Sequence, residues 1–313
     1  MRLHPVSPAL LLALAVPAVA QGGAAPFTVA ETGRGYASLQ DAVSAIGGRT
    51  GTVMIAPGTY RECATQEGGR VTYRARTPGT VVFDGVVCGD KAALVLHGQA
   101  ATVDGIVFRG FRVDDGNGAG IRIETGDLSV INAMFLDSQE GILGMPEGPV
   151  RIAIDRSTFA GLGRCDDSAD CAHSIYLGSE GTVTVTNSRF ERGRGGHYVK
   201  VRSPRVEITD NSFDDTAGRT TNYMIDLPDG ATGQILRNTF VQGRDKENWS
   251  GMIVVAAESR RFRSGGLRVE GNDARLAPGQ TNSPAFVANG SGEQPVIAGN
   301  RLGPRIRSYE VRR

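Results

Sequence analysis

The stretch HSIYLGSEGTVTVTNSRFERGRGGHYVKVR, residues 173–202, contains two short apolar runs with the same polar pattern. HSIYL begins at His173 and HYVKV begins at His197, an offset of 24 residues. Because side chains alternate between the two faces of a strand, we expect Tyr176 and Lys200 on the face opposite to the aliphatic residues. Two copies at one offset favour a repeating chain whose equivalent residues stack on one another.

A third copy, YMIDL at residues 223–227, follows the same pattern and places Asp226 on the outward face. If the copies stack as parallel coils, Tyr176, Lys200 and Asp226 form a column with steps of about 4.8 Å. This column is the candidate functional surface of the protein.

Phenylalanines that each follow a short alternating segment mark further copies. The gaps between them are 27, 24, 31, 23 and 27 residues. Most follow a polar turn, such as Asn132, Asn187 or Asn238, whose side chain can hydrogen-bond to neighbours above and below. This period predicts an all-β, single-domain right-handed parallel β-helix, in which stacked coils share one core. The marker residues are Phe108, Phe135, Phe159, Phe190, Phe213 and Phe240.

The gap of 31 residues contains an insertion, CDDSADC at 165–171, that leads directly to His173. Insertions in solenoids cluster on one face, often the binding face. At the N-terminal side, residues 36–46 have apolar side chains at helical spacing and Ser38 as a possible N-cap, so we expect a short helix that caps the stack. The basic tail, residues 303–313, either covers the other end or is loose.

Composition limits the compartment and the partners. The chain has 313 residues and a formal net charge of +1, which argues for neither nucleic acid nor an acidic membrane as a partner. Residues 1–20 have an apolar centre and end in an A-x-A motif, which predicts a signal peptide and a mature domain of residues 21–313. No later apolar run approaches the roughly 18 residues of a membrane span. We expect a secreted or periplasmic monomer.

Four cysteines suit an oxidising compartment. Cys165 and Cys171 bracket the insertion, and Cys63 and Cys88 are about one coil apart, but four cysteines allow three pairings and the choice stays open. They lack the paired CxxC spacing of a zinc site. Aspartates of the insertion could hold Ca²⁺ or could form a solvated acidic loop, and no other cofactor is expected. These aspartates are Asp166, Asp167 and Asp170.

With YASLQDAVSAI at 36–46, GTVMIAPGTYRE at 51–62 and the Asn/Phe coils, the chain resembles the pectin-lyase-like superfamily of right-handed parallel β-helices. The resemblance covers nearly the whole mature chain. It implies an activity among those of polysaccharide lyases, uronate epimerases, glycoside hydrolases and pectin methylesterases, because this fold hosts them all.

Residues 120–144 look like the pectin methylesterase coil that ends in a Gln-Asp pair, here Gln139-Glu140. The next catalytic aspartate of those esterases would fall at His173-Ser174, where this chain has no carboxylate, so the resemblance does not favour an esterase. The pattern His-x-x-Lys-x-Arg at 197–202 looks more like the basic cleft of lyases or epimerases that act on uronic acids.

Elimination or C5 epimerisation of a uronate needs a cation for the carboxylate, a base for the C5 proton and an acid. Arg202 suits the carboxylate because a guanidinium binds it bidentately. His173, His197 or Lys200 could be the base, and Tyr176 or Tyr198 the acid. Further candidates for substrate binding are Tyr198, Asp226, Tyr223 and Arg122. These residues predict a lyase or C5-epimerase acting on an acidic, uronate-containing polysaccharide.

The same residues also have structural interpretations. Lys200 and Asp226 could be an ordinary ion pair between coils, which would keep Lys200 protonated. His173 and His197 share the inward parity of the aliphatic residues and could be corner residues bonded to the backbone. The tyrosines could be exposed strand aromatics.

Two other functions therefore stay open. One is a non-catalytic glycan-binding protein of the cell envelope. The other is a pectinesterase-like or glycoside hydrolase variant, in which Asp226 would pair with Glu124, Asp127 or Glu140 as a second carboxyl group.

Overall fold

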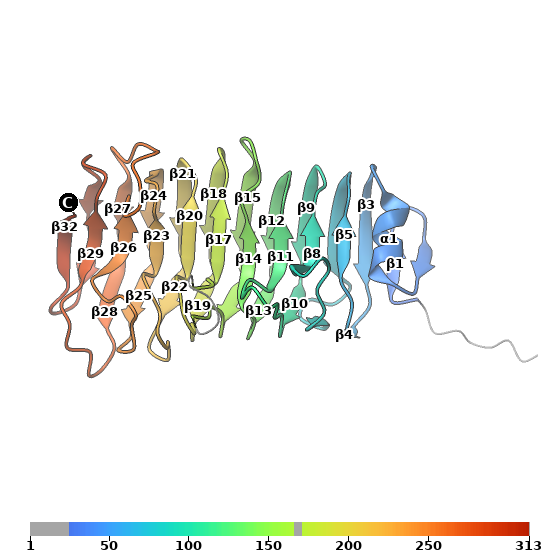
Figure 1. The fold of residues 1–313 in the computed structure, drawn as a ribbon, viewed down its shortest axis with the longest axis horizontal. Helices are drawn as coiled ribbons and strands as arrows, with labels where there is room; N and C mark the ends of the chain where they lie inside the picture. Colours follow the sequence, from blue (N-terminus) through green and yellow to red (C-terminus); the bar gives the residue numbers. More distant parts are fainter. Residues whose placement is uncertain (1–24, 166–170, 313) are drawn as a thin grey trace, which may run out of the picture.

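Short alternating segments of the chain form three β-sheets that run the length of the molecule (Figure 1). The computed structural model describes residues 25–165 and 171–312. Within these residues the fold is an all-β right-handed solenoid in a single domain with one short helix, as the sequence predicts.

The strands fall into sheet A with 12 strands and sheets B and C with 10 strands each. Sheet A contains β2 (Arg34–Tyr36), β1 (Phe27–Val29), β3 (Thr50–Ile55), β6 (Arg70–Ala75), β9 (Ala100–Asp104), β12 (Asp127–Ile131), β15 (Arg151–Asp155), β18 (Thr182–Thr186), β21 (Arg205–Thr209), β24 (Thr232–Leu236), β27 (Arg268–Glu270) and β30 (Val296–Ala298). Sheet B contains β4 (Gly58–Tyr60), β7 (Val81–Asp84), β10 (Ile106–Arg109), β13 (Met134–Leu136), β16 (Thr158–Ala160), β19 (Arg189–Glu191), β22 (Ser212–Asp214), β25 (Thr239–Gln242), β28 (Asp273–Leu276) and β31 (Arg301–Leu302). Sheet C contains β5 (Ala64–Gln66), β8 (Ala92–Leu96), β11 (Ala119–Ile123), β14 (Glu140–Gly144), β17 (Ile175–Gly178), β20 (Val199–Arg202), β23 (Ile225–Leu227), β26 (Gly251–Val255), β29 (Ala285–Asn289) and β32 (Arg307–Val311).

The marker phenylalanines form one column in the core. From Phe108 to Phe240, neighbouring ring centroids are 4.8 to 5.1 Å apart and the ring planes differ by 3° to 9°. Phe83 extends the column toward the N-terminus, with its centroid 5.9 Å from that of Phe108. Parallel pairing in sheet B, for example Phe135 with Phe159, sets this spacing because one residue of each coil faces its equivalent.

The polar turns between sheets A and B contain two kinds of residue. The first residue of the turn has a left-handed backbone, with φ of 52° at Asn132 and 50° at Asn187, so these two asparagines do not stack inside. The second residue points inward, and the Nδ2 atom of Asn211 donates to Oδ1 of Asn238 at 3.0 Å. The predicted hydrogen bonds between coils are confirmed at all three positions, since Asn238 belongs to an inner ladder, Oδ1 of Asn132 accepts from Arg156 and Nδ2 of Asn187 donates to Asp155. The inner ladder consists of Asn211, Asn238, Asn272 and Asn300.

The two ends of the stack are closed differently (Figure 1). Helix α1 (Leu39–Ile46) begins at the N-cap Ser38, whose hydroxyl accepts a hydrogen bond from the backbone N–H of Asp41. Its apolar face is buried against the first coil, which confirms the capping helix, although Tyr36 belongs to β2. The basic tail forms β32, which pairs with β29, so it extends sheet C as its last strand.

Both neighbouring cysteine pairs are disulfides, Cys63–Cys88 and Cys165–Cys171, which settles the pairing that the sequence left open. Two disulfides are consistent with an extracellular protein. Among the residues that the structure describes, none forms a helix with the length and hydrophobicity needed to cross a bilayer. The predicted signal peptide, residues 1–20, lies outside the described residues.

Candidate functional site

The alternation of sheet C breaks at the start of β20 and of β23. Tyr198 and Val199 are consecutive, yet both side chains lie in the core, and the same holds for Met224 and Ile225. Two consecutive inward side chains shift the alternation by one position, so the residues just before them lie on the face opposite to the one that strict alternation predicts. His197 therefore lies on the outer face with Lys200, and the predicted inward parity of the histidines is wrong.

This break places the side chain of Tyr198 in the core and not on the outer surface. Its side chain is 1% exposed, and its hydroxyl donates to Oδ1 of Asp215 at 2.8 Å. Asp215 also pairs with Lys246, whose Nζ atom lies 3.0 Å from Oδ2. The prediction of Tyr198 as a proton donor or substrate-binding residue is therefore wrong, because it belongs to a buried network behind the histidines.

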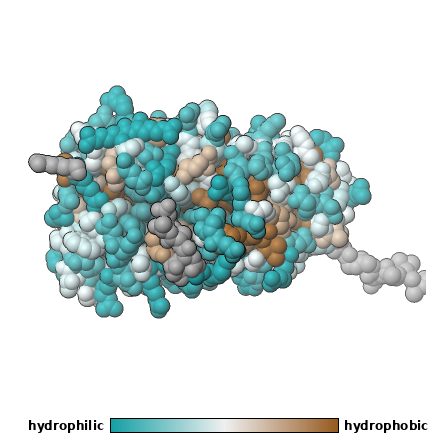
Figure 2. Space-filling view, viewed as in Figure 1, coloured by the Kyte–Doolittle hydropathy of each residue, from teal (hydrophilic) through white to brown (hydrophobic). Residues whose placement is uncertain are grey.

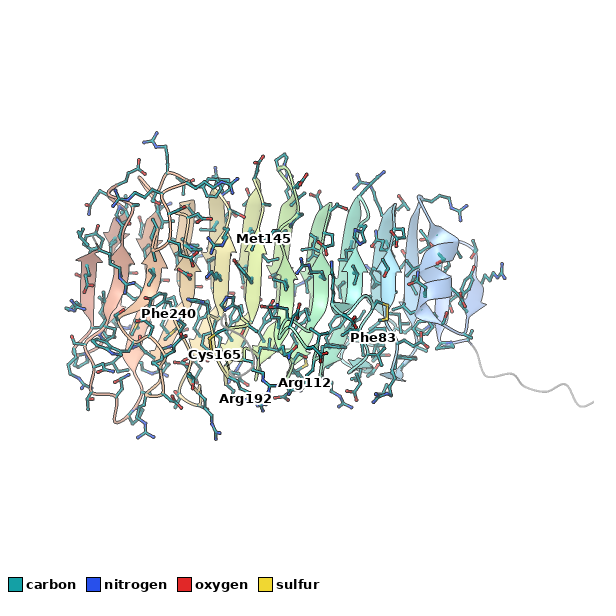
Figure 3. All side chains as sticks on the ribbon, in the orientation of Figure 1. Phe83, Arg112, Met145, Cys165, Arg192 and Phe240 are labelled. Carbon is teal, nitrogen blue, oxygen red and sulfur yellow. A yellow bond between two sulfur atoms is a disulfide. The ribbon has the colours of Figure 1, made fainter. Side chains whose placement is uncertain are left out.

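The outer face of sheet C carries a cavity of about 730 Å³ over β14, β17 and β20. A second cavity of about 510 Å³ shares Arg202 with it and continues past the ends of these strands. Figure 3 labels Met145, which lines the second cavity, and Cys165, whose disulfide partner Cys171 lines the larger one. Five of the predicted catalytic residues line the larger cavity together. They are His173, Tyr176, His197, Lys200 and Arg202.

The predicted column exists in the ladder of sheet C. Tyr176 pairs in register with Lys200, and Lys200 pairs with Asp226. Asp226 is only 2% exposed, because Lys200 and His197 cover it. The column therefore presents Tyr176 and Lys200 to the cavity, with Asp226 beneath them.

The two histidines are in direct contact. The backbone N–H of His197 donates to Nδ1 of His173 at 3.1 Å, and the two Nδ1 atoms are 3.4 Å apart. Burial, followed by the positive charge of Lys200, lowers the pKa of His173 to about 3. Burial and His173 itself lower the pKa of His197 well below its ordinary value. Both rings are therefore neutral at pH 7, and because Nδ1 of His173 accepts the backbone N–H of His197, its Nε2 atom carries the ring proton.

Asp226 lies at the far side of the histidine pair. Its Oδ2 atom is 3.5 Å from Nε2 of His197 and 3.7 Å from Nζ of Lys200, and its buried Oδ1 atom has no hydrogen-bond partner among the described residues. Burial raises the pKa of Asp226 to about 7, although Lys200 acts in the opposite direction. Asp226, His197 and His173 thus form a line along which a proton can be shared at neutral pH.

Both cations of the cavity already have carboxylate partners. Nζ of Lys200 lies 2.8 Å from Oε1 of Glu258, and the guanidinium of Arg202 contacts Oε2 of the same side chain. Arg202 also bonds to Asp229 at 2.8 Å and donates from Nε to the Tyr176 hydroxyl at 2.9 Å. The groove is therefore no basic cleft, contrary to the resemblance at 197–202. Sequence reasoning missed Glu258 and Asp229, which come from turns outside the repeat pattern.

Glu140 brings a further carboxyl group to the cavity wall. Its Oε1 atom accepts the backbone N–H of His173 at 3.3 Å, and its buried Oε2 atom has no partner in the described part of the chain. Burial raises the pKa of Glu140 well above its ordinary value. Of the carboxyls considered as partners of Asp226, only Glu140 lines the cavity, because Asp127 begins β12 in sheet A and Glu124 is bonded to Lys91 and Arg122.

The family model described as the right-handed β-helix region matches residues 92–274. The chain belongs to this family. The predicted resemblance to pectin-lyase-like parallel β-helices is thereby confirmed at the level of the fold. Comparison of the sequence with curated proteins gives no match.

Solved structures with this β-helix include a PL6 family alginate lyase, AlyGC, with a TM-score of 0.41 and 14% identity over 85% of this chain. The chain spans only 39% of the length of that lyase. The mannuronan C-5 epimerase AlgE4 A-module of Azotobacter vinelandii gives a TM-score of 0.39 and 14% identity, with 87% of this chain and 91% of that chain covered. The surface protein and adhesin PfbA of Streptococcus pneumoniae gives 0.41 and 11%, with 87% and 94% covered.

Two predicted substrate-binding residues of this β-helix protein lie outside the cavity lining. Arg122 occupies the outward column of sheet C, but Leu143 separates it from Tyr176 and its guanidinium is bonded to Glu124. The Tyr223 ring lies 5.5 Å from that of His197, but its hydroxyl accepts hydrogen bonds from Asn248 and Arg312. The polar atoms of both side chains are thus already bonded outside the cavity, and their role in substrate binding stays a prediction.

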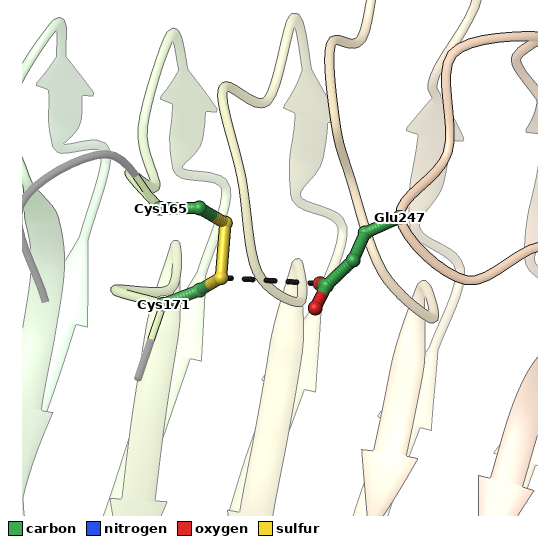
Figure 4. A group of neighbouring side chains, drawn as sticks. All are labelled: Cys165, Cys171 and Glu247. Atoms are coloured by element: carbon green, nitrogen blue, oxygen red, sulfur yellow. Dashed lines mark hydrogen bonds between the residues drawn. A yellow bond between two sulfur atoms is a disulfide. The ribbon is translucent and has the colours of Figure 1, made fainter. Parts of the chain in front are cut away.

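The β-helix has one described group with metal-ligand spacing, Cys165, Cys171 and Glu247 (Figure 4). The cysteines are joined in a disulfide, and Sγ of Cys171 is 3.9 Å from Oε2 of Glu247. Disulfide sulfurs are not thiolates, so this group does not fit a metal. The predicted Ca²⁺ ligands lie outside the described residues, which leaves that prediction untested. They are Asp166, Asp167 and Asp170.

Proposed function

We propose that the groove on sheet C binds a uronate-containing glycan, and that the protein is a polysaccharide lyase or a C5-epimerase. Support comes chiefly from one juxtaposition: the neutral His173 stands beside Tyr176, with ring centroids 5.1 Å apart, and Lys200 and Arg202 flank the same tyrosine. A base next to two cations is what removal of a proton beside a carboxylate requires.

In the proposed reaction, the oxygen of Tyr176 takes the C5 proton after its own proton has passed to solvent, because Nδ1 of neutral His173 accepts a hydrogen bond and Nε2 of that ring already carries a proton. The C–H electron pair moves toward the carboxylate of the substrate, where the charges of Lys200 and Arg202 stabilise it. In a lyase the pair then expels the C4 oxygen, which takes a proton from an acid. In an epimerase a proton returns to C5 from the opposite face.

Two groups suit the role of the acid. His173 can donate from Nε2, because Nδ1 of the neutral ring accepts the backbone N–H of His197. Glu140, whose pKa burial raises well above its ordinary value, also lines the cavity. Asp226, whose pKa is raised to about 7, can supply a proton through His197 to Nδ1 of His173 as Nε2 gives up its own.

The test is incubation of the protein with alginate, polygalacturonate and glucuronan. A lyase gives the ultraviolet absorbance of an unsaturated uronate, and an epimerase gives no absorbance but exchanges the C5 proton with D₂O. His173→Ala should lower either rate by about 10²- to 10⁴-fold, the usual contribution of a general acid or base. His97→Ala, an exposed histidine of an earlier coil, is the matched control and should keep the wild-type rate.

Non-catalytic glycan binding is the second candidate, and one observation favours it. Lys200 and Arg202 are each paired with two carboxyl groups. The groove therefore has little net positive charge to stabilise a negatively charged transition state. If the protein binds glycans of a panel but produces no unsaturated-uronate absorbance and no exchange of the C5 proton with D₂O, non-catalytic binding is favoured over the enzyme.

A further inference from the structure

Glu258 occupies an unusual position in the groove. It follows β26, and its carboxylate spans the two cations, with Oε1 on Lys200 and Oε2 on Arg202. The Glu258 side chain is 45% exposed, whereas those of Lys200 and Arg202 are 11% and 22% exposed. The carboxylate therefore lies on the solvent side of a cationic pair that is built into the wall.

Each cation also has a carboxyl partner other than Glu258. Asp226 lies 3.7 Å from Lys200, and Asp229 lies 2.8 Å from Arg202, both within the wall. If the Glu258 side chain turned away, each cation would keep a buried partner, and the usual penalty for an unpaired buried charge would not arise.

The backbone of this turn is fixed, so only the side chain can leave. The N–H groups of Glu258 and Ser259 both donate to the carbonyl of Pro228, and the Ser259 hydroxyl donates to Asp229. Burial acts to raise the pKa of Glu258, but Lys200 and Arg202 outweigh it and lower the pKa below its ordinary value, so the side chain is a carboxylate at neutral pH.

We infer that Glu258 stands where the carboxylate of the ligand binds, and that it determines specificity by competing for the Lys200–Arg202 pair. A uronate carboxylate offers the same two acceptor oxygens and can displace it, whereas a neutral sugar has no group that restores the charge-assisted bonds. The inference rests on the proposed function in that it takes the ligand to be a uronate.

Calorimetric titration of the full chain with trigalacturonate and with trimannuronate tests the inference. Methyl-esterified trigalacturonate is the neutral probe. Glu258→Gln keeps the shape of the side chain but removes its charge, and we expect about tenfold tighter binding of at least one acidic probe, since every 1.4 kcal/mol is tenfold. Binding of the neutral probe should not change.

Glu180→Gln is the matched control, because Glu180 lines the adjoining cavity and its carboxylate is 3.8 Å from Arg261, away from Lys200. An equal gain in this variant would show a general effect of charge and would overturn the inference. Unchanged or weaker binding of both acidic probes by Glu258→Gln, or no detectable binding, would also overturn it. Glu258→Ala should give the same gain, and melting curves of both variants check that they fold.

The two proposals fail separately. If Glu258→Gln binds an acidic probe more tightly but neither protein turns over any polymer, the catalytic proposal fails and the role of Glu258 stands. If the wild type turns over a polymer but Glu258→Gln binds the acidic probes no better, the role of Glu258 fails and the enzyme stands.

Discussion

The outer face of sheet C carries an apolar cluster over β8, β11 and β14, beside Arg122 and Glu140, but polar side chains over β17, β20 and β23, although one ladder joins all six strands. In the first group, Ala92, Val95, Ala119 and Leu143 pack together, and Figure 2 shows a brown area over these coils. In the second group the same outward column holds Tyr176, Lys200 and Asp226. The backbone is common to both, so the outward side chains alone separate a structural wall from a candidate site.

The corners between sheets B and C differ in the same way. Phe111 and Leu162 fill the earlier corners with fully buried apolar side chains. The later corner holds the Asp215–Lys246 ion pair instead, with side chains that are 0% and 1% exposed, and Thr221 and the Tyr198 hydroxyl complete its bonds. A buried charge pair is tolerated in a core only when hydrogen bonds satisfy its remaining polar atoms. Here the Asp215–Lys246 pair also holds the Tyr198 side chain inward, so that the histidines lie on the outer face.

Loss of the buried pair should have the largest effect. Asp215→Ala leaves the Lys246 ammonium in the core without its carboxylate, and we expect the free energy of unfolding to fall by about 3 to 5 kcal/mol. The control from the earlier coils is Asp104→Ala, which removes the partly exposed partner of Arg74 and should cost about 1 kcal/mol or less. Urea unfolding measures both, and equal losses would contradict the special cost expected for breaking the buried pair.

The second prediction compares two arginines of the outer face. Arg202→Ala removes a cation of the groove and should lower kcat/KM on a uronate polymer by about 10²-fold, as loss of one electrostatic donor does. Arg122 lies in the earlier coils and is bonded to Glu124. Arg122→Ala should keep kcat/KM within about twofold, because a partly exposed ion pair contributes little. A large loss in Arg122→Ala would mean that the site extends over the apolar coils.

The smallest effect concerns acid stability. His173 has a pKa of about 3 in the folded protein against an ordinary 6.5, so the unfolded chain binds a proton that the folded chain does not bind between these values. Its contribution is therefore fully present above pH 6.5 and is lost as the pH falls toward 3. From pH 7 to 5 the wild type should lose about 2 kcal/mol more than His173→Gln.

Asp226 has the opposite sign. Its pKa is raised to about 7, so its contribution is present at low pH and is lost as the pH rises from about 4 to 7. This contribution is common to wild type and His173→Gln and cancels in their difference, which urea unfolding at the two pH values measures. His97→Gln, from the earlier coils, should behave as the wild type, and a parallel loss in all three proteins would contradict the prediction for His173.

Much of the architecture was accessible from residue spacing. The phenylalanine period predicted the coils, and the shared offset of the histidine runs predicted that Tyr176 would lie beside Lys200 and Asp226. Prediction failed at Tyr198, where strict alternation was assumed although two consecutive residues turn inward. It also failed at Glu258 and Asp229, because residues in turns carry no periodic signal that assigns them a neighbour.

By itself the chain determined that it would wind into a solenoid, since apolar residues at a regular interval can be buried only by stacking one turn on the next. It also determined which polar side chains would share a column, because parallel pairing fixes the register. Only the tertiary structure decided their chemistry. Burial made the histidines neutral and left Asp226 and Glu140 as carboxyls of raised pKa, and turns distant in sequence supplied the partners of Lys200 and Arg202. Proton affinity depends on desolvation and on nearby charge, and neither exists until the coils have closed around these groups.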